Sequence, residues 1–146
     1  PTIEAIAATK ILKSYLPDLK IRFINVVDLM KLDSTTNHPH ALNDIAYDYL
    51  FTKDKPIIFA FHGYPTLIHN IHVHGYIEEG TITTAFDMRV KNKIDRFNLV
   101  IDAVNNLDLG SIGEKIISDM NKKIEEHNNY IKEYGEDLEE IRNWRF

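Results

Sequence analysis

The sequence predicts an α/β domain with a three-layer αβα arrangement around a mostly parallel sheet. Residues 57–61, Ile-Ile-Phe-Ala-Phe, form an apolar run without polar alternation, which is typical of a strand covered on both faces in a parallel sheet. A second β-branched run precedes it, and helical patterns separate the two. Helices that join neighbouring strands imply parallel pairing through right-handed crossovers.

The composition fits one globular domain over residues 1–146, large enough for a sizeable core, with 44% hydrophobic residues. The net charge of −5 and the lack of a basic block argue against a nucleic-acid partner. No apolar run approaches the roughly 18 residues of a membrane span, so we expect no membrane partner. The absence of cysteine is compatible with a cytoplasmic protein. Because the chain begins at Pro1 without methionine, we expect it to be a fragment of a longer chain.

Two helices and one strand are expected before the apolar run. Thr2 is a candidate N-cap for an amphipathic helix that Pro17 ends. Residues 20–27 are enriched in β-branched side chains and predict a strand. Asn43 or Asp44 is expected to cap the second, short helix.

A weak strand and two long helices are expected after the apolar run. Residues 71–76 alternate weakly and predict the strand, followed by a polar turn at 80–84. Thr83 or Thr84 is expected to cap one long helix. The buried stripe of that helix is predicted to contain Phe86, Val90, Ile94, Phe97, Ile101 and Val104.

The last long helix is expected to open on the S-x-x-E capping box formed by Ser111 and Glu114 and to end at Gly135. His127 is interpreted as a packed histidine rather than a ligand. The tail that contains Trp144 is expected to dock onto the body of the domain. The buried face of the helix is predicted to consist of Ile117, Met120, Ile124, His127, Ile131 and Tyr134.

The candidate site lies where the apolar strand ends, because ligands and partner surfaces usually lie at the carboxyl ends of parallel strands. His62 could act as a general acid or base near neutral pH, although a backbone hydrogen bond at the strand's end is the favoured interpretation. The residues that we expect to face the remainder of a larger protein are His62, Gly63, Tyr64, His72, His74, Glu78 and Glu79.

The residues alone do not assemble a complete active site. His72 and His74 on one strand, with Glu78 or Glu79, could bind zinc or iron, but no second ligand motif of recognised spacing supports a metal site. Adjacent carboxylates on an extended backbone point to opposite sides, so Glu78 and Glu79 cannot act as a catalytic pair. We therefore predict no catalytic, metal or cofactor residue. A regulatory module that binds a metabolite at the carboxyl edge and a metal-dependent hydrolase stay open as alternatives.

The sequence resembles the C-terminal domain of the phosphoketolases, which act on xylulose 5-phosphate or fructose 6-phosphate. The resemblance runs over nearly the whole chain. Its most specific segments are KPIIFAFHGYP at 55–65 and GYIEEGTITTAFDMRV at 75–90. The resemblance implies a transketolase-like enzyme of carbohydrate metabolism, an aldehyde-lyase, with a cofactor-binding domain, a pyrimidine-binding domain and this smaller third domain.

The resemblance also implies where the chemistry takes place. Thiamine diphosphate and Mg²⁺ would be held by the two preceding domains at the interface of a homodimer. This domain would carry no cofactor, would pack on the pyrimidine-binding domain of the same chain, and would have a mainly structural role. The isolated fragment is expected to be inactive.

The chain departs from the family's pattern in several places. The family has a longer, arginine-containing stretch between the residues that match His69-Asn70 and Ile71-His72, which are contiguous here. His74 and Ile77 stand where the family is expected to have Arg and Lys, and Ala85 stands in place of Pro. The loss of two cations beside Glu78 and Glu79 argues against a phosphate contact from this strand.

Overall fold

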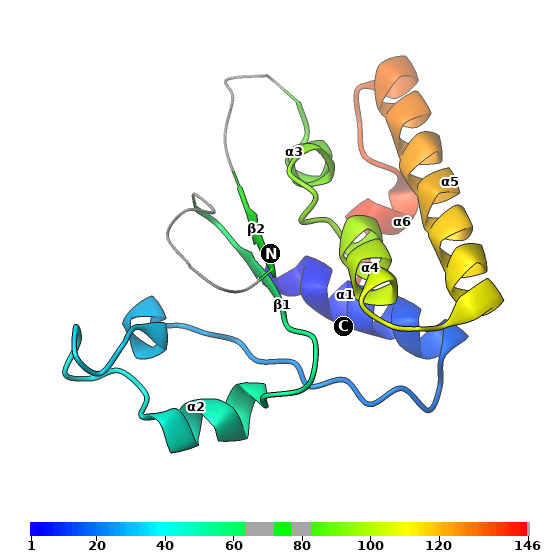
Figure 1. Cartoon of the computed structure of the whole chain (residues 1–146). Coiled ribbons are helices and arrows are strands. Elements are labelled where there is room, and N and C mark those ends of the chain that lie inside the picture. Colours follow the sequence, from blue (N-terminus) through cyan, green and yellow to red (C-terminus); the bar gives the residue numbers. More distant parts are fainter. Residues whose placement is uncertain (64–71, 77–82, 146) are drawn as a thin grey trace. The chain divides into compact units, whose positions relative to one another are not determined.

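The computed structural model describes residues 1–63, 72–76 and 83–145, without the side chains of residues 72–74 (Figure 1). The chain divides into two compact units, Ile21–Ile57 and a larger one made of Pro1–Lys20 and Ile58–Phe146. The elements in chain order are α1 (Thr2–Tyr15), the 3₁₀ helix η1 (Leu29–Leu32), α2 (Asp44–Phe51), β1 (Ile58–Phe61), β2 (His72–Gly75), α3 (Ala85–Lys91), α4 (Arg96–Asn105), α5 (Gly110–Tyr134) and α6 (Glu139–Arg142). None of the helices in these described ranges is both long and apolar enough to cross a membrane.

The described part of the chain is helix-rich, with little strand. β1 and β2 pair in parallel, with Ile58 opposite His72 and Phe61 opposite Gly75. The strands expected within 57–61 and 71–76, and their parallel pairing, are therefore confirmed. β1 also contacts α4, which connects this small sheet to the helices of the larger unit.

The strand predicted at residues 20–27 is wrong. Within the described ranges, residues 20–27 form no regular element and take part in no strand pairing. The β-branched residues that suggested a strand favour a pleated surface only where neighbours cover them. Val27 is 91% exposed, so at this residue no such cover exists.

The helices of the larger unit form its core. α4 packs against both α1 and α5, and α3 packs against α5 (Figure 1). Burial of apolar side chains between these helices is the main stabilising term, at about 25 cal/mol per Å² of apolar surface. The largest apolar side chains that are essentially inaccessible are Phe86, Ile94, Val100 and Ile116.

The single long helix predicted after Thr84 is instead two helices, α3 and α4. The chain turns at Lys93, which has a left-handed φ of 57°. Asp95 then opens α4, because its carboxylate accepts the backbone N–H groups of Phe97 and Asn98 at 2.9 and 3.1 Å. The predicted apolar stripe is nevertheless buried on both sides of the break, apart from a half-buried Ile101. Apolar spacing therefore does not distinguish one helix from two helices that share a core.

The predicted helix caps have mixed outcomes. Thr84 caps α3 as expected, with its hydroxyl accepting the backbone N–H of Asp87 at 3.1 Å. Thr2 does not cap α1, which already begins at this residue. The capping box at Ser111 is also wrong, because α5 begins at Gly110 and Ser111 already lies inside its first turn.

The buried face of α5 agrees with the prediction only in part: Met120 and His127 are buried, but Ile117, Ile124 and Ile131 are half-buried and Tyr134 is exposed. Ile116 is fully buried, whereas Ile117 is only half-buried. Both precede Met120 by a helical spacing of three or four, so packing against α4 decides between them. Tyr134 is 58% exposed because the helix ends there, at a left-handed Gly135 (φ 68°), as predicted.

Within the Ile21–Ile57 unit, side chains cap both ends of α2. Asn43 caps α2 as expected, accepting the backbone N–H of Ala46 at 2.9 Å. At the other end of α2, the guanidinium of Arg22 donates to the carbonyls of Tyr49 and Leu50 at 2.6 and 2.8 Å. These cationic hydrogen bonds satisfy carbonyls that a helix C-terminus leaves unpaired.

Trp144 docks onto the larger unit, as predicted. The ammonium of Lys10 on α1 and the guanidinium of Arg96 on α4 lie 5.2 and 5.1 Å from the centroid of its ring. Such cation–π contacts stabilise the docked tail.

Candidate functional site

The candidate site is the carboxyl edge of the two-stranded sheet. The two strands end side by side, and the backbone N–H of Tyr76 donates to the carbonyl of Gly63 at 3.0 Å. This hydrogen bond extends the pairing past β1 and β2. It places His62 and Gly63, which follow β1, beside Tyr76, which follows β2.

The side chains of His62 and Tyr76 form a ring pair at this edge. Their centroids lie 4.5 Å apart with an interplanar angle of 34°. His62 is exposed and Tyr76 is half-buried, so the pair offers a partly accessible aromatic surface with an imidazole and a phenol hydroxyl. The general acid–base role of His62 and its backbone hydrogen bond both stay predictions.

Tyr76 was not among the predicted site residues, yet the sequence held a signal for it. The register that places Phe61 opposite Gly75 also places His62 opposite Tyr76. Once the two strands are recognised as parallel neighbours that end together, the residues that follow them become neighbours too.

Gly63 is needed for the packing beneath this edge. A Cβ atom at Gly63 would lie 2.7 Å from Cε2 and 3.3 Å from Cδ2 of the Phe61 ring. The Phe61 ring in turn packs near Phe59, with 5.8 Å between their centroids. A larger residue at position 63 would therefore displace Phe61, whose neighbour in the chain is His62.

The other predicted site residues have no described side chain. Tyr64, Glu78 and Glu79 lie outside the described residues. The backbones of His72 and His74 form part of β2, opposite Ile58 and Ala60, but their side chains are not described. The structure thus brings together His62 and Gly63, while the placement of the other five stays a prediction.

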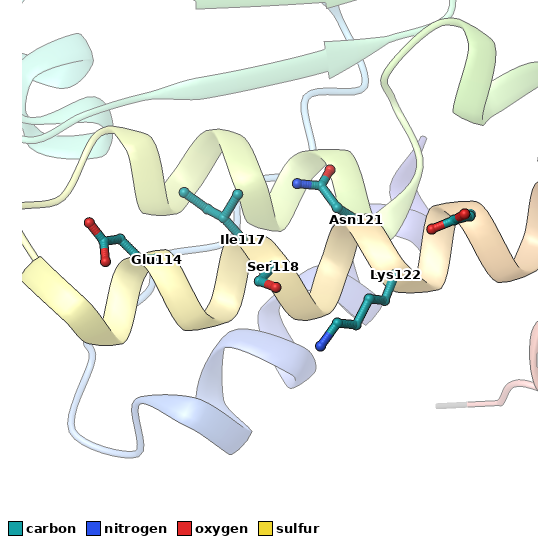
Figure 2. A pocket seen from close by; sticks show the side chains of 6 residues that line it. Glu114, Ile117, Ser118, Asn121 and Lys122 are labelled. Carbon is teal, nitrogen blue, oxygen red and sulfur yellow. The ribbon is translucent and has the colours of Figure 1, made fainter.

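The described residues offer no metal site, and the pocket described on them is an open one. In ranges 1–63, 72–76 and 83–145, no three His, Asp or Glu side chains have a geometry that could hold a metal ion. Figure 2 shows the side chains that line this pocket, and a pocket whose lining side chains all come from one helix has no opposite wall to enclose a small molecule. Its lining residues, all on α5, are Glu114, Ile117, Ser118, Asn121, Lys122 and Glu125.

The sequence also gave no signal for a buried ionic cluster between α1 and α4. Glu4, only 1% exposed, accepts hydrogen bonds from Nε and Nη2 of Arg96 at 2.8 and 3.1 Å and from its backbone N–H at 3.3 Å. Nη1 of Arg89 adds a fourth at 3.1 Å. Arg96 lies over the rings of both Phe86 and Trp144. This cluster connects α1 to α4, with Glu4 and Arg96 buried and the side chain of Arg89 32% exposed.

Comparisons with known proteins give one consistent match. The family model described as the XFP C-terminal domain matches residues 1–146. Similar curated proteins are the "Probable phosphoketolase" of Clostridium acetobutylicum, 58% identical, that of Rhodopirellula baltica, 52% identical, and "Probable phosphoketolase 2" of Rhizobium meliloti, 51% identical. Each alignment covers all of this chain but only 20% of the relative. The alignment with the Clostridium protein spans 156 positions, so ten of them have no residue in this 146-residue chain.

Proposed function

Because this chain belongs to the family of XFP C-terminal domains, we propose that it forms the C-terminal domain of a phosphoketolase. The observation that carries the proposal is the match over residues 1–146, supported by relatives at 51–58% identity of which the chain spans a fifth. Residues 1–146 would then be a single domain of a longer chain. The ten alignment positions that lack a residue here agree with the family having a longer stretch than this chain, which we expect between Asn70 and Ile71.

The proposed parent reaction converts a ketose phosphate and inorganic phosphate into acetyl phosphate, a shortened aldose phosphate and water. Thiamine diphosphate and Mg²⁺ would be bound by the preceding domains in a cytoplasmic homodimer. Among the described residues of this chain, no group of His, Asp and Glu side chains could hold the Mg²⁺.

The proposed role of this domain is to pack on the pyrimidine-binding domain through the carboxyl edge of its sheet. The His62–Tyr76 ring pair is partly exposed and lies next to Gly63 in the chain. Aromatic residues with one polar end are enriched at interfaces, so the pair supports an interface at this edge. The same edge could instead serve a free-standing module that binds a small metabolite.

For the complete domain we propose the three-layer αβα arrangement around a mostly parallel sheet. The parallel pairing of β1 with β2 and the contact of α4 with β1 support it. The further strands of this sheet would come from residues other than those of β1 and β2.

The proposal is tested on the product of the native gene at its full length and on the 146-residue chain. We expect a polypeptide several times larger than 17.0 kDa that makes acetyl phosphate from xylulose 5-phosphate and phosphate, whereas the short chain makes none. A native product near 17 kDa would contradict the proposal and favour the metabolite-binding module. Acetyl phosphate from the pure short chain would contradict the structural role.

The edge itself is tested by Gly63→Ala in the full-length enzyme. The added methyl group displaces Phe61 and so disturbs the His62–Tyr76 pair. We expect weaker docking of the domain, measured as faster limited proteolysis between the domains, together with lower activity. Lys122→Gln, on the outer surface of α5, is the matched control. An unchanged proteolysis rate for Gly63→Ala would argue against the edge as an interface.

A further inference from the structure

His127 on α5 is a buried histidine without a hydrogen bond. Its side chain is 0% exposed, and neither Nδ1 nor Nε2 has a hydrogen-bond partner among the described residues. The ring packs edge-on against Phe86 of α3, with 4.9 Å between centroids. Buried polar groups are nearly always hydrogen-bonded, so an exception of this kind requires a physical explanation.

Two carboxylates approach the same ring nitrogen from different elements. Oδ1 of Asp87, on α3, lies 3.8 Å from Nε2, and Oδ1 of Asp137, between α5 and α6, lies 4.0 Å from it. Both distances exceed that of a hydrogen bond. Thr83 and Lys91 bind the other oxygen of Asp87 at 2.6 and 2.8 Å, which leaves Oδ1 facing the imidazole.

The surroundings of His127 oppose a second proton. An imidazolium would carry an N–H at Nδ1 as well, and the described residues provide no acceptor there. Burial lowers the pKa of His127 below its ordinary value, and the attraction of Asp137, Asp87 and Asp95 offsets this only in part. Two cations lie near this contact: Lys91, which is paired with Asp87, and Arg96, whose guanidinium lies 5.5 Å from the centroid of Phe86, the ring on which His127 packs.

We propose that His127 is an acid-sensitive contact between α5 and the start of α3: the neutral imidazole packs there, and its protonation weakens the packing of α3 on α5. An unpacked His127 can hydrate both N–H groups, so it binds a proton more readily than the packed one. The direction follows from linkage: the contact has its full stability above the pKa of the unpacked histidine, about 6.5, and loses stability as the pH falls below that value.

The test measures hydrogen exchange by mass spectrometry in the full-length gene product at pH 7.5 and pH 5.5, corrected for intrinsic exchange rates. We expect protection of α3 and of the second half of α5 to fall about threefold or more at pH 5.5, relative to the α1–α4 pair. In His127→Leu, which cannot be protonated, this difference should disappear. The exposed-histidine variant His40→Leu should behave like the wild type.

A second variant keeps the test decisive if His127→Leu does not fold. Asp137→Asn removes one of the two carboxylates that favour the imidazolium. It therefore lowers the pKa of the packed His127 and leaves that of the unpacked residue unchanged, so the loss of protection at pH 5.5 should be larger than in the wild type. A wild type without any pH-dependent loss at α3, the same loss in His127→Leu, or a smaller loss at pH 5.5 in Asp137→Asn would overturn the proposal.

Discussion

Two buried polar clusters in the larger unit hold their helices in opposite ways. Between α1 and α4, the carboxylate of Glu4 accepts four hydrogen bonds from Arg96 and Arg89. Between α3 and α5, His127 has no hydrogen bond within the described residues, although two carboxylates lie within 4.0 Å. Both Glu4 and His127 are almost completely excluded from solvent.

The difference shows how hydrogen bonding decides what the loss of a buried ionisable group does to a helix contact. A carboxylate surrounded by guanidinium donors has its charged form stabilised from every side, and removal of one partner leaves an uncompensated charge. An imidazole without hydrogen-bond partners has neither its neutral nor its charged form stabilised by hydrogen bonds. The first cluster joins its helices through hydrogen-bonded ion pairs, whereas the second contains the histidine that we propose to be acid-sensitive.

The largest expected effect comes from breaking the first cluster with Glu4→Gln. Arg96 would stay buried, 4% exposed, without its counter-charge. We expect the free energy of unfolding to fall by about 3–5 kcal/mol, measured by denaturant unfolding followed by circular dichroism.

The double variant Glu4→Leu with Arg96→Met is the matched control for this substitution. Removing both charges leaves no unpaired group, so most of the lost stability should return. A loss below about 1 kcal/mol in Glu4→Gln would show that the cluster contributes no more than a surface pair.

An intermediate effect is expected from Thr84→Ala at the second cluster. The hydroxyl of Thr84 caps α3 and also donates to Asp137, which faces His127. Loss of the cap should lower the free energy of unfolding by about 1–2 kcal/mol. Thr84→Ser keeps the hydroxyl and should retain most of the stability. Equal losses in both variants would mean that the methyl group, rather than the hydrogen bonds, matters.

The smallest effect is expected from Lys123→Gln, which removes an exposed ion pair between α5 and α6. Nζ of Lys123 lies 3.1 Å from Glu140 and 3.2 Å from Glu126, with 39% of the lysine side chain exposed. Solvent screens these pairs, so the free energy of unfolding should change by about 0.5 kcal/mol or less, and less still in high salt. A loss comparable to that of Thr84→Ala would contradict the contrast between buried and exposed charges.

Local patterns predicted the elements whose signal lies within a few residues. The apolar run at 57–61, the Asn43 and Thr84 caps and the Gly135 stop were found because each depends on its own short segment. The strand expected at 20–27 failed because a strand needs a partner that no local pattern specifies. The break at Lys93 was missed because the apolar stripe continues across it.

The sequence predicted which edge of the sheet carries the candidate site, but not all of the residues that meet there. His62 and Gly63 follow from the end of an apolar strand, but Tyr76 enters through the register of a second strand. Glu4 and Arg96 are separated by 92 positions, so no spacing rule connects them. Their pairing is decided by how α1 packs on α4, which is a tertiary property.

The separation between Glu4 and Arg96 also has a consequence for the order of folding. α4 and α5 are neighbours in sequence, so their contact closes a short loop and can form early. α1 reaches α4 only after the whole intervening chain, including the Ile21–Ile57 unit, has been closed into a loop, which carries a larger entropic cost. The Glu4 cluster therefore belongs to the late steps of folding. Its loss should act mainly by accelerating unfolding and leave the folding rate almost unchanged, so that this joint governs how long the folded domain persists.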